Sequence, residues 1–160
     1  MKKIKVFIAT FFNTGKFPIA PGTLASLITA IVLFWINYKI DPNIFSRVLS
    51  IILVFLIGIP CANEAEKFFG KKDPGSIVID EVAGQMLTLL FIKASLSSGS
   101  VFIYLLGFFL FRFFDILKPF PVNLADRIEG GFGIMFDDIV AAIYSLASLH
   151  LIIYLFKLSN

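Results

Sequence analysis

The chain has 160 residues, of which 58% are hydrophobic and 16% charged, with a mean hydropathy of +0.92 and a net charge of +3. Soluble domains carry about 25% charged residues, so the composition excludes an ordinary soluble domain and indicates an integral membrane protein. The basic residues are scattered among apolar runs, which argues against a nucleic-acid-binding surface. The length suits a single domain over residues 1–160, and no linker divides it.

The first segment resembles a short signal peptide but is better explained as a surface helix. Basic residues at positions 2, 3 and 5 precede the apolar run 6–12, and no small-residue cleavage pattern follows. Apolar side chains recur there at helical spacing. We therefore expect an N-terminal amphipathic helix lying on the membrane interface.

Four long uncharged runs follow, at residues 17–38, 48–63, 94–111 and 139–156. A bilayer core of about 30 Å needs roughly 17–25 helical residues, so three runs fit and the run 48–63 is slightly short.

A fifth run, 82–92, spans the membrane only if Asp80 and Glu81 enter it as well. The alternative is a re-entrant or peripheral helix. We favour a full span, because closely packed neighbours can shelter carboxylates at that depth. The sequence thus predicts an all-α, polytopic bundle of about five transmembrane helices plus the N-terminal interfacial helix.

The charges are unevenly divided between the two ends of such a bundle. With a cytoplasmic N-terminus, ten of the 14 Lys and Arg residues lie on the cytoplasmic side, as the positive-inside rule requires. Every acidic residue except Asp41 lies on that side too, which the rule does not explain. Longer loops account for some of them, but not for acids within helical stretches. The pattern indicates a functional site at the cytoplasmic end.

Helical spacing groups several polar residues. Glu81, Gln85 and Thr88 form one polar stripe, because they follow the i, i+4, i+7 pattern. Arg112 and Asp115 are three residues apart and are expected to pair. Acidic side chains within membrane helices cost free energy unless they are paired or bind a cation.

A glycine-rich segment, 130–133, precedes the last predicted span, which carries Asp138 followed by the small residues Ala142 and Ser145. That small face is expected to be a packing surface. At the first predicted span, Thr23 is a reasonable N-cap. The exposed amides at both helix starts suit anions, although turn glycines are common without any such role.

The residue types exclude several mechanisms. The single histidine, His150, lies near the far side of the last span, so histidine-based catalysis is improbable. Cys61 has Lys67 six residues later, where thiol phosphatases have arginine, and its apolar setting disfavours the thiolate. Carboxylates, arginine and lysine remain. Oxygen ligands favour Mg²⁺, and the cations suit a phosphate group.

Four segments in order resemble the motifs of the phosphatidylglycerophosphatase A family: FPIAPGTLASL at 17–27, DPGSIVIDEVAGQ at 73–85, FRFFDILKPFP at 111–121 and GGFGIMFDD at 130–138. One mild departure is Ala25, where many relatives are expected to have glycine. The resemblance implies Mg²⁺-dependent hydrolysis of phosphatidylglycerophosphate to phosphatidylglycerol and phosphate in a bacterial cytoplasmic membrane. Membrane lipids are then the implied partners, and no protein partner is indicated.

The resemblance also implies a set of site residues, whose individual roles are our interpretation. Metal ligation or water activation is assigned to Asp80, Glu81, Asp137 and Asp138. Substrate binding is assigned to Arg112 and Lys118, with Asp73 and Thr23 as further candidates. Asp115 either orients Arg112 or ligates the metal. The nucleophile is either water on the metal or an aspartate.

Two other functions are compatible with a polytopic protein rich in acids. A transporter or channel would use them as an ion path, but its acids should be spread through the membrane depth. A phosphatidyl-transferase using a metal and a nucleotide-activated lipid would need a spaced aspartate–glycine pattern, which the chain lacks. Both rank below the phosphatase.

Overall fold

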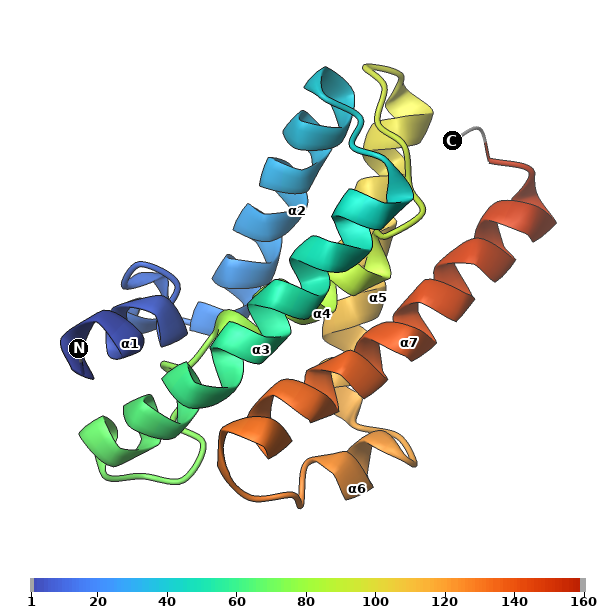
Figure 1. The fold of residues 1–160 in the computed structure, drawn as a ribbon. Helices are drawn as coiled ribbons and strands as arrows, with labels where there is room; N and C mark the ends of the chain where they lie inside the picture. The colour runs from blue at the N-terminus through green and yellow to red at the C-terminus, as the bar shows by residue number, and fades with distance from the viewer. Residues whose placement is uncertain (1, 159–160) are drawn as a thin grey trace.

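The computed structural model describes residues 2–158, and every regular element in that range is helical (Figure 1). In chain order they are α1 (Lys2–Ala9), the 3-10 turn η1 (Thr14–Lys16), α2 (Pro21–Lys39), α3 (Ile44–Phe69), α4 (Ile79–Thr88), α5 (Ser98–Leu117), α6 (Val122–Ala125) and α7 (Gly130–Phe156). The prediction of an all-α membrane bundle is confirmed.

Four of the described helices, α2, α3, α5 and α7, are long and apolar enough to cross a membrane. The preferred full span over 78–92 is not confirmed, because α4 has only 10 residues. At about 1.5 Å per residue it covers about half of a 30 Å hydrocarbon core. Beyond Thr88 the chain runs without a helix to the start of α5 at the other end of the bundle (Figure 1). Between the two ends of the bundle, this part of the chain is therefore partly helix and partly turns and irregular backbone.

Side chains from neighbouring helices satisfy the backbone of this non-helical segment. Arg47 Nη1 donates to the carbonyl oxygens of Leu90 at 3.1 Å and Ile92 at 2.8 Å. Asn37 Nδ2 donates to the Ile92 carbonyl at 3.3 Å and to the Tyr104 hydroxyl at 2.7 Å. Irregular backbone at membrane depth is tolerated only where such partners replace water.

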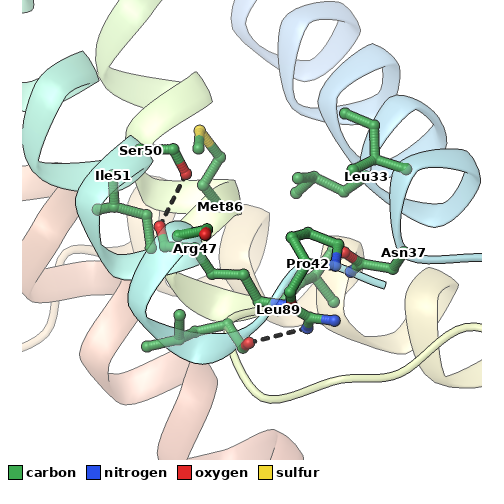
Figure 2. Close-up of a pocket in the computed structure, with 11 residues that line it drawn as sticks. Leu33, Asn37, Pro42, Arg47, Ser50, Ile51, Met86 and Leu89 are labelled. Carbon is green, nitrogen blue, oxygen red and sulfur yellow. Dashed lines mark hydrogen bonds between the residues drawn. The ribbon is translucent and has the colours of Figure 1, made fainter. Parts of the chain in front are cut away.

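Arg47 also lines a cavity of about 270 Å³ between α2, α3 and α4. Figure 2 shows Leu33 and Asn37 of α2 on one side, Ser50 of α3 on the other, and Met86 of α4 nearby. The cavity wall is mainly apolar and belongs to the end of the bundle that carries the Asp41–Arg47 ion pair.

Several helices extend beyond the uncharged runs in the sequence. α3 has 26 residues, begins after the N-cap Asn43 and includes the charged residues at both ends of its apolar run. The helix α7 starts at Gly130, so the 130–133 segment is its first turn and does not precede it. The N-cap prediction for Thr23 is wrong. Helix α2 begins two residues earlier, at Pro21, where a proline is readily accepted because its missing N–H has no helical partner.

α4 is the central element, packed against α2, α3, α5 and α7. Seven of its 10 residues are buried, among them Asp80 and Gln85. The N-terminal helix α1 packs on α3 through Val6 and Ala9, while Lys2 and Phe7 remain exposed. This division of faces agrees with the amphipathic helix expected from the sequence.

Candidate active site

The start of α4 brings two carboxylates into the middle of the bundle. Asp80 and Glu81 stand in its first turn, where the helix dipole favours negative charge. The turn is held in place by a hydrogen bond from the Val78 amide to the Ala9 carbonyl at 3.0 Å. Asp80 is 8% exposed. The backbone of α4 therefore holds the Asp80 and Glu81 carboxylates inside the bundle.

Helix α7 supplies Asp137 and Asp138, which are buried two turns into the helix. The two helices approach closely at this level, because a Cβ on Gly84 would lie 3.2 Å from the Asp138 carbonyl oxygen. One carboxylate oxygen each from Asp80, Glu81 and Asp138 lie within 4.8 Å of one another. These three acids, here called the acidic triad, meet from two helices that are far apart in the sequence.

Glu81 occupies space that only a glycine leaves open. A Cβ added to Gly22 in the first turn of α2 would lie 1.9 Å from Glu81 Oε1. Gly22 therefore does more than allow a turn. Its missing side chain makes room for a carboxylate of the site.

Arg112 borders the acidic triad on the α5 side. Its Nη1 lies 2.8 Å from Asp115 Oδ2 and 3.7 Å from Glu81 Oε1. It also donates to the hydroxyl of Ser26 on α2 at 3.4 Å. The predicted Arg112–Asp115 pair is confirmed, and it orients the guanidinium toward Glu81.

Lys118 borders the site from the C-terminal end of α5. Its Nζ donates to Asp137 Oδ2 at 2.7 Å and forms a second ion pair with Asp126. Partial burial disfavours the charged ammonium, but the hydrogen bonds to the two carboxylates outweigh it and raise the pKa of Lys118 above its ordinary value. Lys118 is therefore a permanent cation at neutral pH.

Unsatisfied polar atoms are concentrated in this site. In the described part of the chain, the buried side-chain atoms without a hydrogen-bond partner are Asp80 Oδ1, Glu81 Oε2, Gln85 Oε1 and Nε2, Arg112 Nε, Asp137 Oδ1 and Asp138 Oδ2. Leaving such a group unpaired costs about 1–3 kcal/mol, and more for a charged one. A single polar guest bound among these groups would satisfy all of them together.

The donor chemistry of the acidic triad fits a divalent cation. Its ligands are hard carboxylate oxygens, each buried acid has an unpartnered oxygen, and like charges this close repel each other without a cation. Asp137 stands beside the triad, with one oxygen on Lys118 and the other unpartnered. Its assignment as a metal ligand stays a prediction.

The remaining sequence candidates lie at the edge. Asp73 is an exposed loop residue and lines, with Asp126 and Asp137, a small cleft at this end of the bundle. Thr23 is half-buried in the first turn of α2, one residue after Gly22. Cys61 and His150 lie on α3 and α7, outside the acidic triad.

Sequence reasoning missed three contributors. Gly22 makes room for Glu81 and Asp126 pairs with Lys118, but neither is among the site residues predicted from the sequence. Gln85 was noticed on the polar stripe but not assigned to the site, and the signal that identifies it is its lack of partners. The contacts of Gly22 and Asp126 do not follow from spacing along the chain, because each joins separate elements.

The fold and the site together define a helical membrane protein with a buried, cation-compatible acidic centre at one end. The chain belongs to the phosphatidylglycerophosphatase A family, whose model matches residues 7–153. It is accordingly a phosphatase.

Curated relatives cover most of the chain. A phosphatidylglycerophosphatase A from Haemophilus influenzae is 39% identical, over 91% of this chain and 90% of the relative. The Escherichia coli phosphatidylglycerophosphatase A is 37% identical, over 91% of this chain and 81% of the relative. A putative phosphatidylinositol-3-phosphatase from Bacteroides thetaiotaomicron is 35% identical, over 89% of each chain. No solved structure matches the chain.

Proposed function

We propose that the protein removes the terminal phosphate of phosphatidylglycerophosphate in an Mg²⁺-dependent reaction at the cytoplasmic face of the membrane. Water attacks phosphorus, the bond between phosphorus and the glycerol oxygen breaks, and phosphatidylglycerol and inorganic phosphate leave. The observation that carries the proposal is the acidic triad flanked by Arg112 and Lys118 at one end of a membrane bundle. The names of two relatives support the substrate.

The metal would be held by Asp80, Glu81 and Asp138, whose oxygens are close enough to share one ion. Bound there, Mg²⁺ would neutralise negative charge that develops on the phosphate oxygens. A single ion with few protein ligands is typical of Mg²⁺, which keeps several waters and contacts substrate phosphate.

The chain's own cations bind and orient the phosphate. Arg112 is held by Asp115, so its guanidinium enters the reaction already oriented and can pair with two phosphate oxygens. Lys118 contributes a point charge from the Asp137 side. Positioning and charge neutralisation of this kind supply most of the catalysis in phosphoryl transfer.

Asp137 is the candidate for moving the proton. Its Oδ2 is held by Lys118, whereas Oδ1 is buried and unpartnered. That oxygen lies outside the acidic triad and is free to accept a proton from the attacking water. The leaving glycerol oxygen takes up a proton from surrounding water as its bond to phosphorus breaks, and Asp137 returns the proton it accepted to the solvent.

Phosphate release by the purified protein in detergent tests the proposal. We expect release from phosphatidylglycerophosphate with Mg²⁺, no release with EDTA, and recovery on adding Mg²⁺ back. Phosphatidylinositol 3-phosphate forms the second substrate arm, because one relative carries that name. Faster turnover of the inositol lipid would reassign the substrate, and full activity in EDTA would overturn the metal role.

Accessibility labelling tests the orientation. Single cysteines replacing Lys71 and Glu129, in a Cys61→Ser background, should react only from the cytoplasmic side, whereas one replacing Asp41 should react only from outside. The site end carries most of the basic residues, which supports this orientation. Labelling of positions 41 and 71 from the same side would contradict it.

A further inference from the structure

Gln85 is a polar residue buried in a place that gives its amide no hydrogen-bond partner. Its side chain is fully buried, and neither Oε1 nor Nε2 has a hydrogen-bond partner. Buried amides in folded proteins are almost always paired. The other residues with unpartnered buried atoms, in the range the structure describes, are Asp80, Glu81, Arg112, Asp137 and Asp138. Gln85 therefore shares one feature with the site residues, namely buried polar atoms that lack a hydrogen-bond partner.

The position of Gln85 on α4 joins it to that site. It lies one turn beyond Glu81, and side chains four residues apart on a helix have their Cβ atoms about 5–6 Å from each other. The next member of the stripe, Thr88, is also fully buried, but its hydroxyl donates to the Gly84 carbonyl at 3.0 Å. Along the stripe, Gln85 therefore resembles Glu81, which also has an unpartnered buried oxygen, and differs from Thr88, whose hydroxyl is partnered.

We propose that Gln85 belongs to the cation site and that its amide oxygen is a neutral ligand, facing the ion or a water molecule on the ion. The inference rests on the metal proposed for Asp80, Glu81 and Asp138. A neutral oxygen has a clear physical use here. It adds a hard ligand, of the kind that Mg²⁺ and Ca²⁺ accept, without adding a further negative charge to a crowded acidic cluster.

A simple packing role predicts something different. If Gln85 only filled space, methionine would serve better, because it has the same length and no polar atoms to bury unpaired. An amide that is kept for binding should instead weaken the fold slightly when the guest is absent. Both roles therefore allow Gln85→Met to be as stable as the wild type without metal, but only the binding role predicts a loss of metal affinity and of stabilisation by the metal.

The test is direct Mn²⁺ binding to the purified full-length protein in detergent, followed by electron paramagnetic resonance. Mn²⁺ serves as the probe because it takes the same oxygen ligands as Mg²⁺. Gln85→Met should weaken Mn²⁺ binding by roughly 10–100-fold, the range typical of supporting ligands around a metal. Gln85→Glu keeps an oxygen at the same place and should bind Mn²⁺ at least as tightly as the wild type. The matched control is Thr88→Val, one turn away on the same stripe, which should leave the affinity unchanged.

Thermal unfolding supplies the second readout. Without divalent ions, Gln85→Met should unfold at or above the wild-type temperature, and saturating Mn²⁺ should raise the wild-type value by more than that of the variant. Gln85→Leu also removes both amide atoms and replaces the methionine variant if that one does not fold.

Wild-type Mn²⁺ affinity in a folded Gln85→Met or Gln85→Leu protein would overturn this inference alone, because the metal proposal would stand. Absence of Mn²⁺ binding by the wild type would overturn both.

Discussion

Gly22→Ala should separate activity from stability, because the added methyl group meets the side chain of a proposed metal ligand, Glu81, and not the backbone. The new Cβ would lie 1.9 Å from Glu81 Oε1 and 2.9 Å from Glu81 Cδ. Ordinary contact begins near 3.4 Å, so the carboxylate must retreat by about 1.5 Å. Glu81 is a flexible side chain, and its carboxylate can move while α2 and α4 stay in place.

The expected loss of activity follows from that displacement. Misplacement of a catalytic group by about 1 Å can reduce the rate about 100-fold, so we expect at least that reduction in kcat with Mg²⁺ present. Alanine is the better helix former by roughly 0.5–1 kcal/mol, which offsets the cost of moving the side chain. The unfolding temperature should therefore change little.

The two assays are phosphate release, which gives kcat, and thermal unfolding, both measured on the same preparations. Gly75→Ala is the control, because the same methyl group would there meet nothing within 4 Å. A Gly22→Ala protein with wild-type kcat would refute the placement of Glu81 in the site. A Gly22→Ala protein that does not fold would show that the close approach is structural.

Three further substitutions test the site. Asp138→Asn should abolish most phosphate release without lowering the unfolding temperature measured in EDTA, since it removes a buried charge; wild-type activity would exclude Asp138 as a ligand. Arg112→Lys should lower kcat/KM at least about tenfold, because lysine cannot form the bidentate pair; equal kcat/KM would mean that Arg112 acts only as a point charge. Cys61→Ser and His150→Ala should both retain most activity, because neither residue belongs to the acidic triad. Loss of phosphate release in a folded Cys61→Ser protein would point to thiol chemistry.

The sequence predicts the helical class and most site residues because both depend on local pattern. Long uncharged runs identify membrane helices, and acidic residues at the start of such helices are rare enough to single out Asp80 and Asp138. The end of α4 at Thr88 could not be predicted, because the residues that follow are apolar and would suit a longer helix. What permits the break lies elsewhere in the chain, in the side chains of Asn37 and Arg47 that bind the freed carbonyl groups. The role of Gly22 was hidden for a similar reason, since its partner is 59 positions away.

The shortness of α4, which has 10 residues, affects how the protein is assembled in the membrane. Ten residues are too few to span a bilayer as an independent helix, and the acids in the first turn, Asp80 and Glu81, are costly to insert unless neighbouring helices shelter them. The neighbours that enclose α4 include α5 and α7, which are synthesised after it. We therefore expect α4 to reach its final depth only when α7 has entered the membrane. Because α4 carries Asp80 and Glu81 of the acidic triad and α7 carries Asp138, we expect a nascent chain to have no phosphatase activity until the whole bundle has formed.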